Sequence, residues 1–159
     1  MTNEAHATRQ RLTADPAMPV PFHLAIPVHD LDEARRFYLG TLGCSQGRSG
    51  ADWLDLDFFG HQIVVHVMPA GAPQCLVKVG ENRIDGHAVP LPHFGVVLEM
   101  DPWKTLATRL TRDGVTFVLE PHIRYEGRVN EQASMMLHDP SGNAIEFKAF
   151  ANVACLFAT

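Results

Sequence analysis

Cysteine is scarce in this chain, and long apolar runs are absent. The three cysteines, Cys44, Cys75 and Cys155, are odd in number and lack CxxC spacing, which predicts reduced thiols in a cytoplasmic protein rather than a disulfide framework. No stretch approaches the roughly 18 apolar residues of a membrane span, and no apolar signal segment follows Met1. We therefore expect neither a signal peptide nor a membrane partner.

Positive charge is also in short supply. Lys and Arg number 13 against 18 Asp and Glu, the net charge is −5, and the basic residues form no cluster. A nucleic-acid-binding surface is therefore not expected. With 159 residues, of which 46% are hydrophobic, the chain suits one globular domain or two small modules that share a sheet. Histidine, in contrast to cysteine and the basic residues, is abundant, with nine residues.

The two ends of the chain lie outside its regular pattern. Residues 1–20 mix charge, alanine and threonine without periodicity and lead into prolines, which predicts a loosely ordered N-terminal arm. The tail, residues 152–159, contains the apolar run 153–157. This run either covers an interface or packs on its own domain.

Residues 21–68 predict a first module. Positions 22–28 alternate, so that His23 faces away from the apolar side chains of the strand. Asp30 and Glu33 resemble a capping box that starts a helix, and Gly43 ends that helix. Strands at 53–59 and 62–68 follow, and His66 lies on the face opposite Ile63, Val65 and Val67.

Residues 93–151 repeat this order as a second module. A strand at 93–100 begins with His93, a helix starts at Asp101 and ends at Gly114, and strands are expected at 115–119, 133–137 and 144–150. Asp139–Asn143 forms the tight turn before the last strand, where Glu146 faces away from Ile145 and Phe147. The connection, residues 69–92, contains several Gly and Pro and is predicted to be mainly loop.

Four residues of metal-ligand type thus sit on the non-core faces of predicted strands: His23, His66, His93 and Glu146. Two modules paired into one curved mixed sheet would bring these faces around one cleft. Two histidines and a glutamate form the facial triad of non-haem iron sites, and the same set holds other divalent metals. The alternative is an open antiparallel sheet whose polar face meets water. Spacing alone leaves both possibilities open, because there is no local motif such as HExxH.

Two longer motifs carry a family resemblance. HLAIPVHDLDEARRFYLGTLG at 23–43, with HFGVVLEM at 93–100 and DPSGNAIEF at 139–147, resembles the vicinal oxygen chelate superfamily of glyoxalases, bleomycin-resistance proteins, fosfomycin-resistance transferases and extradiol dioxygenases. The segments WLDLDFFGHQ at 53–62 and DGHAVPLPHF at 85–94 are similar to small proteins predicted to be extradiol-type dioxygenases. The resemblance implies a single α+β domain at 21–151, with two βαβββ modules paired into one curved sheet around a metal cleft and helices on the outer face.

The resemblance also implies a site. His23, His93 and Glu146 correspond to the metal ligands, and Fe(II) is expected, with Mn, Ni, Co or Zn as other possible metals. The fourth position falls on His66, either as a catalytic acid–base group or as a further ligand. Arg124, Tyr125 and His138 are expected to bind the substrate.

The implied activity is that of an oxidoreductase: cleavage of a catechol-like aromatic diol by O2 at a mononuclear non-haem metal, in a homodimer. Two alternatives stay open. One is a glyoxalase-like isomerase or lyase, and the other is a resistance protein that only sequesters its ligand.

Overall fold

The computed structural model describes residues 20–73, 75, 76, 78, 80–84 and 86–157. Apart from Val20, the predicted N-terminal arm lies outside the described residues. Within the described part, no helix is both long and apolar enough to cross a membrane.

Module one forms a four-stranded mixed sheet with the order β1-β4-β3-β2. Strand β1 runs parallel to β4, and the other neighbours are antiparallel. The Asp30 carboxylate accepts a hydrogen bond from the Glu33 amide at 2.7 Å, as expected of a cap. Strand β2 was not predicted because its residues, SQGRS, are polar and exposed throughout. The elements are β1 (His23–Val28), α1 (Leu31–Arg35), the π-helical η1 (Arg36–Thr41), β2 (Ser45–Ser49), β3 (Trp53–Phe58) and β4 (His61–Val67).

Module two repeats this arrangement with the order β7-β10-β9-β8. Strand β8 runs on into the stretch after Leu119 that was expected to be loop, and its register shifts between Leu119 and His122. That irregularity accommodates Pro121, which cannot donate to a regular ladder. The elements are β7 (Phe94–Glu99), α2 (Met100–Arg112), β8 (Phe117–Arg124), β9 (Gln132–His138), β10 (Ala144–Phe150) and the short 3-10 helix η2 (Val153–Phe157).

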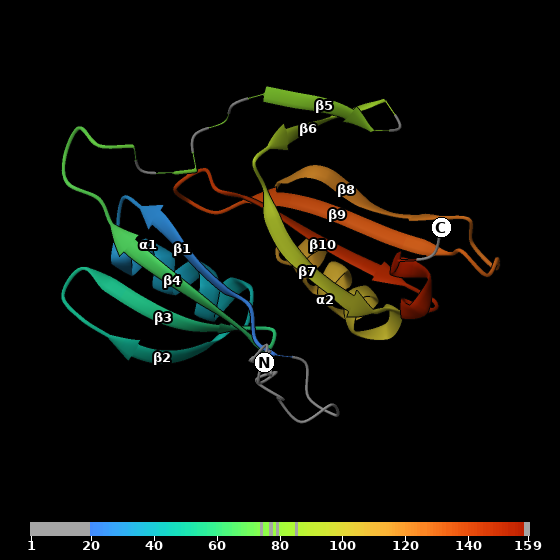
Figure 1. The fold of residues 1–159 in the computed structure, drawn as a ribbon, viewed down its shortest axis with the longest axis horizontal. Coiled ribbons are helices and arrows are strands. Elements are labelled where there is room, and N and C mark those ends of the chain that lie inside the picture. The colour runs from blue at the N-terminus through green and yellow to red at the C-terminus, as the bar shows by residue number, and fades with distance from the viewer. Residues whose placement is uncertain (1–19, 74, 77, 79, 85, 158–159) are drawn as a thin grey trace, which may run out of the picture.

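The connection between the modules is not mainly loop, because it contains a hairpin of β5 (Gly80–Ile84) and β6 (His87–Leu91). Gly86 adopts φ 84° in the turn, a conformation that favours glycine. The hairpin lies over module two (Figure 1), where Val89 packs with Leu119, Met136 and Ala144. The Gly and Pro content of this segment predicted a loop, because composition does not reveal that Val89 packs on module two.

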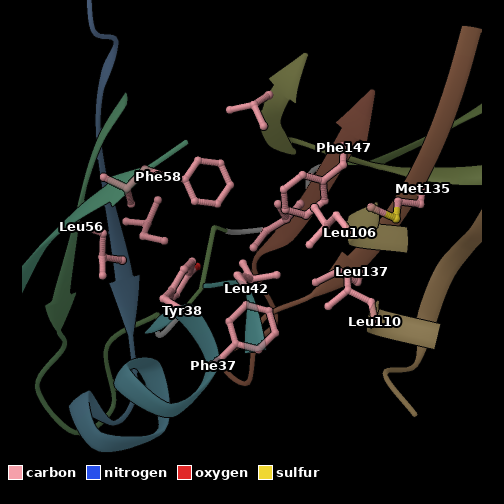
Figure 2. Close-up of a cluster of buried hydrophobic side chains, with 14 of the residues drawn as sticks. Phe37, Tyr38, Leu42, Leu56, Phe58, Leu106, Leu110, Met135, Leu137 and Phe147 are labelled. Carbon is pink, nitrogen blue, oxygen red and sulfur yellow. The ribbon is translucent and has the colours of Figure 1, made fainter. Parts of the chain in front are cut away.

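One hydrophobic core joins the two modules. Phe58 of β3 approaches Phe147 of β10, with ring centroids 5.9 Å apart, and side chains of η1 and α2 fill the space beside them (Figure 2). Each helix therefore packs on the core side of its own sheet, opposite the face that carries the candidate ligands. The α+β class and the two paired modules are confirmed. In detail, hydrogen bonding divides the predicted single sheet into two four-stranded sheets.

The turn at residues 139–143 explains how these two sheets meet. Asp139, only 4% exposed, accepts the Tyr38 hydroxyl at 2.9 Å, and Asn143 donates from its side-chain amide to the Pro27 carbonyl at 3.0 Å. The Ser141 hydroxyl accepts the backbone amide of His29 at 3.1 Å. Side chains of module two thus satisfy backbone groups at the end of β1, in place of a strand-to-strand ladder.

Candidate metal centre

His93 and Glu146 are brought together by neighbouring strands. Strand β7 pairs parallel with β10, Glu146 lies opposite Gly95, and His93 directly precedes β7. His93 Nε2 lies 3.3 Å from Glu146 Oε2, and the two side chains are only 21% and 18% exposed. This confined pair is the centre of the candidate site.

Gly95 permits the close approach of the two strands. A Cβ atom at this position would lie 1.6 Å from the Glu146 carbonyl oxygen, which is backbone and cannot move aside. Any side chain at residue 95 would therefore push β7 away from β10 and separate His93 from Glu146.

Hydrogen bonds orient both members of the pair. The Pro90 carbonyl lies 2.8 Å from His93 Nδ1, and because a carbonyl can only accept, Nδ1 donates and Nε2 is the ring nitrogen that faces Glu146. The Ser134 hydroxyl donates to Glu146 Oε1 at 2.6 Å. The facing nitrogen and carboxylate are satisfied either by a proton that the pair shares or by a metal ion that both bind. The donor set and its orientation thus fit a divalent metal.

His23 shows the same orientation on the other module. Its Nδ1 lies 2.8 Å from Gln62 Oε1, its partner in the β1–β4 register, and its exposed ring keeps Nε2 available. His23 does not join His93 and Glu146 within one chain, because no group of three His, Cys, Asp or Glu among the described residues is placed to hold a metal ion. In Figure 1, β1 starts near the N label at the lower side of the view, whereas β7 starts at the upper side, just after β6.

His66 is exposed on the same face as His23 but at a different level. It pairs with Pro27 and Trp53, four residues along β4 from Gln62, which is about 13 Å along a strand. Gln62, rather than His66, is therefore the neighbour of His23. His66 borders a separate, mainly apolar cavity of about 380 Å³ with Ala25, Pro27, Met68 and Pro73.

A second cavity, of about 170 Å³, opens beside His93 and Glu146, and we call it the module-two cavity. The β5–β6 hairpin and strands β8, β9 and β10 supply its walls. Of the three predicted substrate-binding residues, only Arg124 lines it. Other lining residues are His87, Val89, Leu119, His122, Ser134 and Lys148.

Tyr125 and His138 lie apart from this cavity. Tyr125 is 42% exposed, adopts φ 56° beyond the end of β8, and receives the Arg124 guanidinium over its ring at 5.3 Å. His138 is exposed at the end of β9, on the same face as Glu146. Neither side chain lines the module-two cavity, and their substrate roles stay predictions.

Among the titratable residues that line the module-two cavity, sequence reasoning missed His87, His122 and Lys148. Lys148 carried a usable signal, since it is two residues from Glu146 on β10 and therefore shares its face. His87 and His122 carried none, because each sits in a segment that was expected to be loop. Their rings stack with centroids 6.2 Å apart.

Two clearly shifted pKa values belong to acids that are packed in the core outside the site. Burial, and then the charge of Asp57, raise the pKa of the Cys44 thiol to about 12, so it stays protonated near neutral pH. Burial, and then Asp139, raise the pKa of Tyr38 well above its usual value. Cys44 is thus a packed thiol without nucleophilic character.

Comparison with known proteins agrees with this architecture. Residues 21–147 match the family described as the glyoxalase/bleomycin resistance protein/dioxygenase superfamily. A solved glyoxalase/bleomycin resistance protein/dioxygenase from Alicyclobacillus acidocaldarius is 32% identical, with a TM-score of 0.67, and the match covers 87% of this chain and 96% of that one. A search of curated proteins gave no match.

More distant structures share the fold. Lactoylglutathione lyase from Agrobacterium tumefaciens is 16% identical with a TM-score of 0.58, covering 89% of this chain and 98% of that one. The fosfomycin resistance protein FosX from Listeria monocytogenes is 14% identical with a TM-score of 0.55, covering 84% and 93%. The family match spans most of the chain, so this protein belongs to the glyoxalase/bleomycin resistance protein/dioxygenase superfamily.

Proposed function

We propose that this protein is a metal-dependent enzyme, an extradiol-type dioxygenase whose metal is held by His23, His93 and Glu146. Superfamily members commonly use a divalent metal, and several are enzymes. The observation that carries the proposal is the His93–Glu146 pair, in which the ring nitrogen not bonded to Pro90 and a carboxylate oxygen lie 3.3 Å apart and are directed at one site. Fe(II) is the metal assigned, because two histidines and one carboxylate leave coordination positions open for a chelating substrate and for O2.

In this proposal a second copy of the chain supplies the third ligand. His23 lies on the open face of module one, and the pair lies on the matching face of module two. Two chains related by a two-fold axis bring module one of each against module two of the other, which forms two equivalent sites. The homodimer is thus a requirement of the proposed site.

The residues around the pair have separate tasks. The bound metal would lower the pKa of the substrate's vicinal hydroxyls and hold both oxygens in place. Pro90 fixes the ring of His93, and Ser134 fixes the carboxylate of Glu146. His66 is assigned proton transfer rather than ligation, since its distance from the level of His23 along the strands suits contact with a substrate better than contact with a shared ion.

Anaerobic reconstitution followed by substrate screening tests the proposal. The purified protein is loaded with Fe(II) without oxygen, and oxygen uptake is then measured with a panel of catechols. We expect uptake that depends on Fe(II) and disappears in Glu146→Gln, which keeps the size of the side chain but removes its charge.

Two results would count against the dioxygenase. Tight binding of Ni or Zn, with isomerisation of a 2-oxoaldehyde–thiol adduct and no oxygen consumption, would indicate a glyoxalase-like enzyme. Binding of a ligand with equal affinity by the unaltered protein and Glu146→Gln, without turnover, would indicate sequestration.

A further inference from the structure

The two modules share one strand register, so residues of module one have counterparts in module two. Strand β4 pairs parallel with β1, as β10 pairs with β7. The β1 residue opposite His66 comes four residues after His23. The β7 residue opposite Lys148 comes four residues after His93. Lys148 is therefore the counterpart in module two of His66, the residue assigned to proton transfer.

Lys148 lies beside the His93–Glu146 pair. It follows Glu146 by two residues on β10, so both side chains share one face and their Cα atoms are about 6.6 Å apart. The module-two cavity is lined by Lys148 together with His93 and Glu146, and a neighbouring cavity of about 240 Å³ is bordered by the same three residues. Lys148 thus borders the space from which a small molecule reaches the pair.

The positive charge of Lys148 is not neutralised by a neighbour. Lys148 forms no ion pair or hydrogen bond with any of the described residues. The carboxylate of Glu146 instead uses its two oxygens toward His93 and Ser134. Lys148 is also partly buried, as Glu146 is. An ammonium group in such a place attracts negative charge more strongly than one in bulk water, because the local dielectric constant is lower.

We infer that Lys148 is a further substrate-binding residue of the proposed site, with its ammonium group pairing with an ionised oxygen of the diol. The inference rests on the proposed function, since it requires a diol at the His93–Glu146 pair. A protonated lysine has no lone pair for a metal, and its distance from Glu146 along β10 suits contact with a molecule that the metal holds.

The two-chain site gives Lys148 and His66 complementary tasks. Lys148 comes from module two of one copy, and His66 comes from module one of the other. His66 takes a proton from one hydroxyl of the diol, and Lys148 stabilises the negative charge that remains on that oxygen.

Zinc-loaded protein and the coloured diol 4-nitrocatechol test the inference. Zn(II) in place of Fe(II) excludes oxygen chemistry, and the absorption spectrum of 4-nitrocatechol reports the ionisation of its hydroxyls. Lys148→Met removes the charge and keeps the length of the side chain. We expect it to raise the pKa of bound 4-nitrocatechol by about one to two pH units and to weaken binding of the probe at pH 7 about tenfold.

Two further measurements separate the charge of Lys148 from a structural role. Zn(II) itself should bind Lys148→Met about threefold or more tightly than the unaltered protein, because a neighbouring like charge is gone. Lys148→Arg should keep the pKa of the bound probe low. Lys104→Met, at an exposed position on α2, is the matched control and should change neither the pKa nor the Zn(II) affinity.

An unchanged pKa of bound 4-nitrocatechol in Lys148→Met would overturn the inference. So would weaker binding of both Zn(II) and the probe, which indicates a structural role, or no binding of the probe to the unaltered zinc protein. The proposed function fails separately: a Lys148-dependent pKa without oxygen uptake by the Fe(II) protein on any catechol would reject the dioxygenase and retain the role of Lys148. Oxygen uptake together with an unchanged pKa would do the reverse.

Discussion

Modules one and two have the same order of elements, yet their non-core faces differ in cover and in charge. The face of module one is open at His23 and His66, whereas the β5–β6 hairpin roofs the face of module two. Module one carries Asp55 and Asp57 on this face, and module two carries Arg124 and Lys148. A repeated fold has thus produced one open face and one covered face.

The difference in charge also bears on how two chains would meet. Asp55 is buried and pairs with Arg48 at 3.1 Å, while Asp57 is exposed. An acidic face of one copy against a basic face of another gives complementary potentials, whereas like faces would repel. The comparison therefore favours the pairing of unlike modules that the proposed site requires.

The largest expected effect comes from removing His23 in one chain and Glu146 in the other, so that each variant chain keeps only one part of the proposed site. His23→Ala and Glu146→Gln should each lower metal affinity by about 100-fold or more, since each removes one ligand of the proposed site. Mixed dimers of the two variants would contain one intact site and one doubly altered site. After unfolding and refolding together, the mixture should regain about a quarter of the unaltered metal-binding capacity and oxygen uptake.

Size-exclusion chromatography with light scattering provides the companion measurement, and the unaltered protein should elute as a dimer. A mixture of His23→Ala with Arg112→Gln, an exposed position on α2, controls for dilution. Metal binding and oxygen uptake no greater than the sum for the separate variants would show that module one of one chain does not form a site with module two of the other.

The next effect concerns the joint that holds the modules together. Asp139→Ala should lower the free energy of unfolding by about 3 kcal/mol, because the buried Tyr38 hydroxyl and the Asn143 amide both lose their acceptor. Tyr38→Phe should cost about 1–2 kcal/mol, since it removes one bond of the same group. Urea denaturation measures both, and Asp113→Ala, at an exposed position, should stay within about 0.5 kcal/mol. A cost for Asp139→Ala no larger than that of Asp113→Ala would mean that the turn does not join the modules.

A smaller change removes the roof from module two alone. Val89→Ala deletes the apolar contact between the hairpin and the buried residues Leu119 and Met136. We expect amide exchange in β6 to accelerate about tenfold, which corresponds to about 1.4 kcal/mol of local stability, while exchange in β1 and β4 stays unchanged. Uniform acceleration in both modules would contradict the view that only module two is covered.

The smallest effect is a dependence on alkaline pH that originates in module one. The folded state keeps the Cys44 thiol protonated up to a pKa of about 12, whereas the unfolded thiol loses its proton near pH 9.0. The unfolded state thus binds fewer protons between these values, and stability should fall as pH rises from about 9 toward 12. Urea denaturation at pH 8, 9.5 and 10.5 measures this decline. Cys44→Ala should make it shallower, and Tyr38 should contribute in both proteins. An equal decline in both would assign the effect to other groups.

Sequence periodicity predicted the parts of this fold that repeat. The alternation around His23 and Glu146 placed both residues on non-core faces, and the Asp30 cap was predicted correctly. The predicted cap at Asp101 was wrong: α2 begins at Met100, its N-cap residue is Glu99, and no side chain caps it. The pairing of His93 with Glu146 followed from two predicted strands whose neighbour relation the family resemblance supplied. These features are local, or shared by a whole superfamily, and a single sequence therefore reveals them.

Features that depend on tertiary packing were not accessible in this way. The β5–β6 hairpin contains polar and glycine residues and exists because Val89 finds a buried surface on module two. Strand β8 continues past Pro121 because its register shifts there, a change that residue-by-residue alternation does not detect. His87 lies on the hairpin and His122 on the continued part of β8, so the sequence alone did not predict that both line the cavity.

Gly95 has a consequence for how variation in such proteins is interpreted. Its hydrogen atom occupies the only room that the Glu146 carbonyl leaves, so even alanine there would disturb the His93–Glu146 pair without changing either residue. Saturation mutagenesis scored by metal content should rank position 95 among the least tolerant, alongside residues that do chemistry. A position can thus look catalytic to genetics when its whole contribution is the absence of a side chain.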